Sequence, residues 1–164
     1  EAIRTTSLSD SYNTISSTYI RNLLSTGGIA RANRLLGYHY FVYGTIVHGN
    51  HIGTKISTPT INILPTSDKL LPLNGVYVTN TEISGKRYRS VTNIGIRPTI
   101  EEQKKQIGVE THILDFNEDI YGQEAKVDFL AFIRPEKKFA SLDDLALQIH
   151  KDTKRAKSYS KRIK

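Results

Sequence analysis

Five runs rich in β-branched and aromatic residues follow one another between residues 38 and 134, separated by turn signals such as Asn74-Gly75 and Ser84-Gly85. No helical segment of about 10–15 residues lies between them, as parallel strands would require. Closing an antiparallel sheet into a barrel removes its exposed edges. The sequence therefore predicts a mainly β fold, a six-stranded antiparallel barrel with strands near residues 40–47, 61–64, 75–80, 87–94, 109–114 and 127–133.

Short helices are expected on both sides of this region. Residues 1–15 form an irregular lead-in, and residues 16–37 have the spacing of two helices, the first capped by Ser16 and ended by Gly27-Gly28. Gly37 suits the end of the second helix. A sequence similar to a capping box, starting at Ser141, opens a C-terminal helix whose apolar positions are Leu142, Leu145, Ala146 and Ile149.

The net charge of +7 lies almost entirely at the C-terminus. Residues 151–164 contain seven Lys and Arg residues and one acid, Asp152, whereas the other 150 residues carry 16 basic and 15 acidic side chains. We interpret the basic run as a solvated helix end, where cations also suit the helix dipole. A nucleic-acid-binding patch is the alternative.

The composition limits the possible classes of protein. There is no cysteine, so disulfides and Cys-based zinc sites are excluded, and the five histidines are not spaced as metal ligands. No apolar run approaches the roughly 20 residues needed to cross a bilayer, which predicts a soluble, cytoplasmic protein. The chain starts Glu1-Ala2-Ile3, without an initiator Met or a signal-peptide pattern, and we expect it to be cut from a longer protein.

Two segments could contact phosphates or a metal. Gly49, Gly53 and Lys55 form a glycine-bearing loop that lacks the spacing of a P-loop, so it is either a loop whose N–H groups approach phosphates or a β-turn with a surface lysine. In extended chain after Pro59, Thr60 and Asn62 project to one face and offer the hard oxygen donors that Mg²⁺ prefers. A polar edge strand is the alternative for that pair.

Glu110 is the candidate for acid–base chemistry. Strand alternation places Val109 and Thr111 on one face and Glu110 and His112 on the other. A carboxylate in this position is either a general base that accepts a hydroxyl proton or a solvated residue on the barrel exterior. The local sequence does not choose between them.

These segments, taken in order, resemble riboflavin kinase, the C-terminal module of bacterial bifunctional riboflavin kinase/FMN adenylyltransferase. The resemblance covers roughly residues 16–152 and includes Pro59-Thr60-Ile61-Asn62 and Val109-Glu110-Thr111-His112. The other matching stretches are residues 16–21, 32–38, 44–49, 75–77, 93–99, 114–116, 120–122 and 132–139.

The resemblance implies a Greek-key barrel that transfers the γ-phosphate of ATP to the 5′-hydroxyl of riboflavin, giving FMN and ADP. It implies that Glu110 is the catalytic base, that Thr60 and Asn62 hold Mg²⁺ and the nucleotide phosphates, and that Arg134 lies on the flavin side. Gly49, Gly53 and Lys55 would belong to the loop that covers those phosphates. Ser57-Thr58 departs from the family pattern of a glycine followed by an apolar or aromatic residue, which puts nucleotide affinity in question more than chemistry.

The resemblance also suggests two regions. Residues 1–37 would be the end of an adenylyltransferase module with linker helices, and residues 38–164 the kinase barrel with its C-terminal helix and basic tail. The nucleotide-binding His motif expected near the start of an adenylyltransferase is absent, so this chain is expected to make FMN but no FAD, although its parent would make both. A nonenzymatic barrel that binds nucleic acid through its tail, and a fragment that only holds a neighbouring module or a second copy, are the alternatives.

Overall fold

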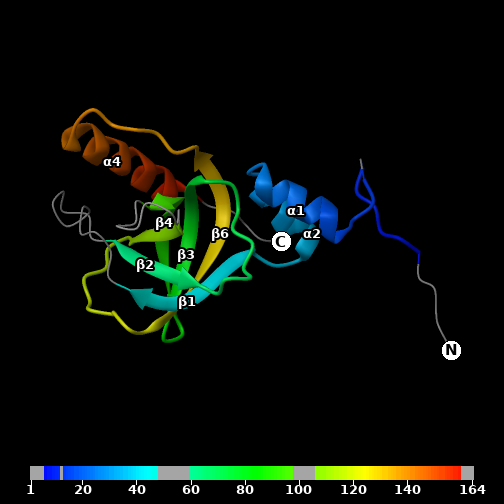
Figure 1. Ribbon diagram of the computed structural model, residues 1–164, viewed down its shortest axis with the longest axis horizontal. Helices are drawn as coiled ribbons and strands as arrows, with labels where there is room; N and C mark the ends of the chain where they lie inside the picture. Colours follow the sequence, from blue (N-terminus) through cyan, green and yellow to red (C-terminus); the bar gives the residue numbers. More distant parts are fainter. Residues whose placement is uncertain (1–5, 12, 48–59, 98–105, 160–164) are drawn as a thin grey trace.

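A computed structural model describes residues 6–11, 13–47, 60–97 and 106–159 (Figure 1). Six strands form a closed barrel in the order β1-β2-β5-β4-β3-β6, with every neighbouring pair antiparallel. The predicted fold class is thus confirmed. The strands are β1 (Phe41–Val47), β2 (Ile61–Pro65), β3 (Gly75–Ile83), β4 (Lys86–Arg97), β5 (Gln106–Ile113) and β6 (Glu124–Arg134).

The expected helices are present and begin where the cap residues indicated. Helices α1 (Ser17–Ser25) and α2 (Ile29–Leu36) form a hairpin, and α4 (Leu142–Ser158) follows the last strand. The Ser16 and Ser141 hydroxyls accept the backbone N–H groups of Tyr19 and Asp144. Gly37 ends α2 in the left-handed conformation, with φ 78°.

One face of each strand points into the barrel. Aliphatic and aromatic residues from all six strands fill the interior, and Tyr77 packs edge-on against Phe129 and Phe132. Burial raises the pKa of the Tyr77 hydroxyl, which donates to the carbonyl of Leu73. The interior therefore keeps a buried phenol neutral and hydrogen-bonded.

A row of hydroxyls runs across the interior between β3, β4 and β5. Thr79 Oγ1 lies 2.7 Å from Ser90 Oγ and 2.8 Å from Thr92 Oγ1, which in turn lies 2.9 Å from Thr111 Oγ1. Thr81 contacts Ser90 in the same way. All five side chains are fully buried, so this hydroxyl row satisfies its own hydrogen-bonding groups within the barrel.

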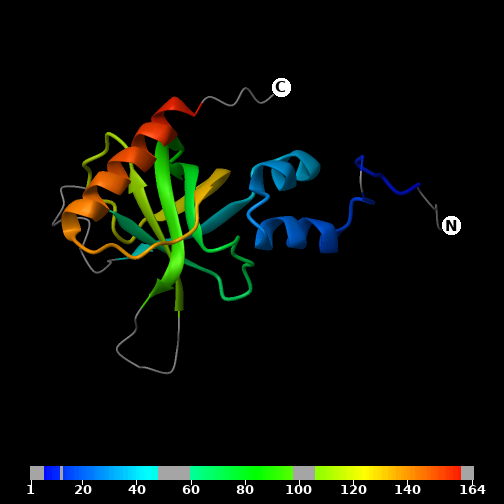
Figure 2. The ribbon, with the colours of Figure 1, turned by 90° about the horizontal axis from the view of Figure 1, so that it is seen from above.

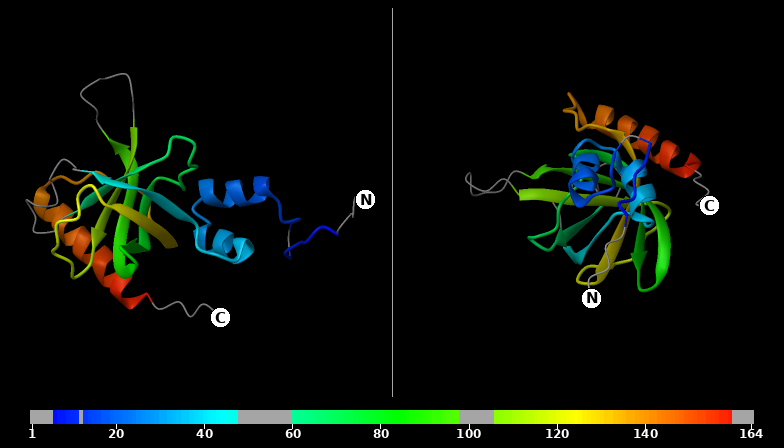
Figure 3. Two further views of the ribbon diagram at one scale, coloured as in Figure 1. Left: turned by 90° about the horizontal axis from the view of Figure 1, so that it is seen from below. Right: turned by 90° about the vertical axis from the view of Figure 1, so that its right-hand side faces the viewer.

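The α1–α2 hairpin packs at one end of the barrel, away from α4 (Figures 2 and 3). Asn33 makes the polar connection: its amide nitrogen donates to the carbonyl of Phe129, and its oxygen accepts the N–H of Tyr40, both at 2.8 Å. Leu24, Ile29 and Ala32 belong to the same buried cluster as the barrel interior. The hairpin and the barrel therefore share one core.

Helix α4 lies across the outer face of β3 and β4 (Figure 1). Ala156 packs with Val78, Val91 and Leu130 in a second buried cluster. The basic run up to Ser158 is the last part of this helix, as expected, and Lys157 there pairs with Asp115 at 2.9 Å. Within the described residues, no helix is long and apolar enough to pass through a bilayer.

Candidate functional site

A cleft of about 280 Å³ lies on the outside of the barrel, where Thr60 and the strands β3, β4 and β5 meet the end of β6 and helix α4. Its barrel side combines polar side chains with Val76 and Val91, and its helix side contributes Leu145 and Ile149. Three of the candidate residues line it: Thr60, Glu110 and Arg134. The cleft is also lined by Val76, Val91, Asn93, His112, Glu136, Lys137, Phe139 and Asp152.

Glu110 lines the cleft from β5. Val109 and Thr111 are fully buried in the barrel, which confirms the predicted alternation and turns Glu110 and His112 outward into the cleft. The Thr60 hydroxyl donates to Glu110 Oε1 at 2.6 Å. The structure therefore joins two candidate residues that are 50 positions apart in the sequence.

Asn62 lies beside Glu110, but its environment differs. The two residues are directly opposite across β2 and β5, with Asn93 opposite Glu110 on the other side. The Asn62 side chain is only 1% exposed, and among the described residues neither its Oδ1 nor its Nδ2 has a hydrogen-bond partner. A buried amide without a partner is costly, which points to a function other than folding.

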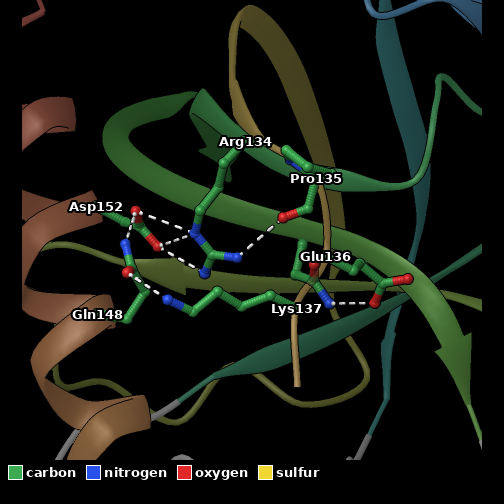
Figure 4. A network of polar contacts seen from close by, with 7 residues as sticks. Arg134, Pro135, Glu136, Lys137, Gln148 and Asp152 are labelled. Atoms are coloured by element: carbon green, nitrogen blue, oxygen red, sulfur yellow. Dashed lines mark hydrogen bonds and ion pairs between the residues drawn. The ribbon is translucent and has the colours of Figure 1, made fainter. Parts of the chain in front are cut away.

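Arg134, at the end of β6, is fixed by ion pairing. Its Nε and Nη2 donate to Asp152 Oδ2 at 3.0 and 2.8 Å, and its Nη1 donates to the carbonyl of Pro135 (Figure 4). Its guanidinium also lies 5.8 Å from the centre of the Phe139 ring. The candidate flavin-side residue thus lines the cleft while it is held by helix α4.

Sequence reasoning missed several residues of this wall. In the sequence Asp152 is only the single acid of the basic run, and Asn93, Glu136 and Lys137 lie in stretches that resemble the family but carry no expected role. Glu136 lies over Gly95, where an added Cβ would come within 1.9 Å of its carboxylate. Two features of the sequence could have pointed to these residues: Gly95, and the i, i+4 spacing that places Gln148 and Asp152 on one face of a helix.

A smaller cavity of about 70 Å³ adjoins the cleft at Thr60. Thr60 lines both spaces, whereas Phe116, Asn117 and Glu118 line only the smaller one. Thr60 is therefore the residue that the two cavities share.

Gly49, Gly53, Lys55 and the divergent pair Ser57-Thr58 lie outside the described residues. Within the described part of the chain, no three His, Asp or Glu side chains gather in a way that could hold a metal. Any ion bound here would depend on few protein ligands, as Mg²⁺ does when phosphates and waters supply the rest.

A barrel with a cleft on its outer wall, lined by a carboxylate and a hydroxyl with a buried amide on the neighbouring strand, is typical of small β-barrel enzymes that act on bound small molecules. The family model for riboflavin kinase (flavokinase) matches residues 36–160. The chain therefore belongs to the riboflavin kinase family.

Individual relatives agree with this assignment. The chain is 39% identical over 146 residues to the bifunctional riboflavin kinase/FMN adenylyltransferase of Bacillus subtilis, and 41% identical to that of Haemophilus influenzae. Each match covers 88% of this chain and 46% of the relative, so the chain spans about half the length of the curated relatives it matches. A crystal structure of a macrolide-efflux protein from Streptococcus pneumoniae superposes with a TM-score of 0.88 at 35% identity, over 94% of this chain and 50% of that one.

Proposed function

We propose that this chain transfers the γ-phosphate of ATP to the 5′-hydroxyl of riboflavin, giving FMN and ADP. The observation that carries the proposal is the contact between Thr60 and Glu110 on the floor of a cleft, with a second cavity meeting it at Thr60. The cleft volume is near the lower end of the roughly 300–1,000 Å³ range of small-molecule sites.

Glu110 is the general base in this proposal. As the bond forms between the riboflavin 5′-oxygen and the γ-phosphorus, the hydroxyl proton passes to the Glu110 carboxylate, and the bond from phosphorus to the β,γ-bridging oxygen breaks to leave ADP. Phosphoryl transfer requires mainly positioning and charge stabilisation, so a single outward carboxylate on a rigid strand is sufficient. Such a base typically contributes about 10²–10⁴-fold to the rate.

Thr60 and Asn62 are proposed to hold Mg²⁺ together with the nucleotide phosphates. The residues fit this role: Thr60 lines the cleft with its hydroxyl bonded to Glu110, and the buried Asn62 amide has no partner within the described residues. When bound, the ion would neutralise the charge of the phosphates. Gly49, Gly53 and Lys55 are proposed, from the sequence alone, to cover the phosphates.

Arg134 is proposed to contact the flavin from the other side of the cleft. The support is that the cleft includes it, and that its guanidinium is already oriented by Asp152. A preoriented guanidinium loses little side-chain entropy when a ligand binds.

The longer protein is proposed to be bifunctional, because the Bacillus and Haemophilus relatives carry both activities in their names and are about twice as long. In that protein the adenylyltransferase domain would be a covalent partner, and dependence on ATP favours a cytoplasmic location. Nucleic-acid binding is not favoured, since the chain belongs to an enzyme family and its basic run is a helix end.

The test is an assay of the purified chain with riboflavin, ATP and Mg²⁺, with the flavins separated by chromatography. The expected product is FMN without FAD, and omission of Mg²⁺ with excess chelator should abolish its formation. A folded chain that forms no FMN would contradict the proposal. Formation of FAD would show that residues 1–37 do more than the sequence indicates.

A further inference from the structure

We infer that Asp152 is a positioning residue for the cleft: through Arg134 it holds residues 135–139, the connecting segment between β6 and α4, opposite Glu110. The kinetic part of this inference rests on the proposed function. The structural part does not, because it follows from contacts among described residues that form the wall of the cleft (Figure 4).

Asp152 is a buried charge with well-defined partners. It is 3% exposed, and its carboxylate accepts hydrogen bonds from Arg134 Nε and Nη2 and, at 3.0 Å, from Gln148 Nε2. A buried carboxylate is tolerated only with such partners, and the two bonds from one guanidinium, which converge on Oδ2, hold that guanidinium in one orientation. Asp152 thus fixes where the Arg134 side chain lies.

Arg134 passes this constraint on to the connecting segment. Its remaining terminal nitrogen, Nη1, donates to the carbonyl of Pro135 at 3.1 Å, and the Phe139 ring packs against the guanidinium. The first and last residues of the segment are therefore both held by a group that Asp152 orients.

Gln148 adds a second connection from the same helix. While its amide nitrogen donates to Asp152, its oxygen accepts from Lys137 Nζ at 3.4 Å. Between these fixed points Glu136 lies over Gly95, with its carboxylate 3.5 Å from the Asn93 amide nitrogen. The whole segment is positioned against β4, and β4 pairs with β5, the strand that carries Glu110.

This arrangement separates binding from chemistry. Glu110 belongs to β5, whose inner face is tied to β4 by the hydroxyl row, so loss of Asp152 should leave the base in place. The connecting segment and Arg134 form the opposite wall of the cleft. An interaction with the substrate that is equally strong in the ground state and in the transition state affects KM and not kcat. Asp152→Asn should therefore raise the KM for riboflavin by about tenfold or more, with kcat changing by less than about threefold.

The matched control is Asp115→Asn. Asp115 pairs with Lys157 on the same helix, but its side chain is 78% exposed and it lies away from the cleft. Its φ of 55° suits asparagine, so the backbone should be undisturbed. This variant also removes one ion pair between α4 and the barrel, and it should change neither KM nor kcat.

The experiment measures amide hydrogen exchange over residues 134–141 together with steady-state kinetics. Faster exchange there and a raised riboflavin KM in Asp152→Asn, but not in Asp115→Asn, would support the inference. Equal effects in both variants, or a fall in kcat alone, would overturn it. If the unsubstituted chain forms no FMN, the proposed function fails, and the exchange data still support or overturn the positioning role.

Two further variants keep the test valid if Asp152→Asn does not fold. Gln148→Ala leaves the ion pair intact and removes the connection to Lys137, so it should raise the riboflavin KM by a smaller factor, about two- to fivefold. In an Arg134→Gln background, Gln148→Ala should have a smaller effect than in the unsubstituted chain, because only the connection to Lys137 is then left to lose and the effect through Asp152 and Arg134 is already gone. Additive effects would show that α4 acts on the cleft by another route.

Discussion

Polar side chains on the inner face of the barrel strands and those on the outer face lie in different environments. On the inner face, Thr79, Thr92 and Thr111 are fully buried and bond to one another. On the outer face, Glu110 bonds to Thr60 at the floor of a cleft, and Asn62 is buried with no partner for its amide among the described residues. The inner side chains therefore satisfy one another, whereas the described residues leave the Asn62 amide, on the outer face of β2, without a partner.

This difference separates structural from functional polarity. A buried polar group that is fully hydrogen-bonded stabilises a particular register, whereas one without a partner costs stability and is retained for another purpose. The inner hydroxyl row should therefore contribute to the free energy of unfolding, and the polar residues of the outer face should contribute to ligand binding and turnover. Substitutions on each face can test this division.

The largest effect is expected on the outer face, from Glu110→Gln. Glutamine preserves the shape and can still accept from Thr60, but it cannot take the hydroxyl proton, so kcat should fall by about 10²–10⁴-fold. The melting temperature should stay within a few degrees of the unsubstituted chain. Near-normal turnover of a folded variant, measured by FMN formation, would remove Glu110 from the role of base.

A smaller effect is expected from Asn62→Ala, for which Asn33→Ala is the matched control. Asn33 is also buried, but both of its side-chain groups are hydrogen-bonded, so its loss should cost about 1–3 kcal/mol of unfolding free energy. Asn62→Ala should cost less than about 1 kcal/mol, because it leaves no donor or acceptor unpaired.

Steady-state kinetics should also distinguish these two variants. Asn62→Ala should raise the KM for MgATP by about tenfold, as expected for loss of one ligand or phosphate contact, while Asn33→Ala should leave it unchanged. Denaturant unfolding and steady-state assays on both variants make the comparison. A large loss of stability in Asn62→Ala with normal KM would mean that this amide serves the fold.

The smallest effect is expected from Thr92→Val on the inner face. Valine keeps the shape but removes the hydroxyl that joins Thr79 to Thr111, so the unfolding free energy should fall by about 1–2 kcal/mol. Both kcat and KM should be unchanged, because the side chain points away from the cleft. Reduced kcat at full stability would show that the inner row also affects the position of Glu110.

Local patterns predicted the fold well because its determinants are local. The alternation around Glu110, the cap at Ser16 and the cap at Ser141 each depend on neighbours within a few residues, and all three agree with the structure. The strands β3, β4 and β6 extend further than predicted, since cross-strand pairing continues through charged hairpin ends such as Glu82 and Arg87.

The wall of the cleft could not be predicted in the same way. Asp152 pairs with Arg134, 18 residues earlier and on another element, and in the sequence it is one acid among seven basic residues. The candidate roles of Thr60 and Glu110 come from family resemblance, because local sequence leaves each of them between a ligand-binding and a surface role. The role of Arg134 comes from the resemblance alone.

The connection made by Asn33 bears on where this protein can be divided. The family match begins at residue 36, yet a chain cut there would lose the amide that pairs the Tyr40 N–H and the Phe129 carbonyl. It would also uncover the barrel surface against which Leu24, Ile29 and Ala32 pack. We therefore expect the smallest unit that folds alone to be longer than the family match, and any domain exchange or fusion should keep the junction ahead of Ser16.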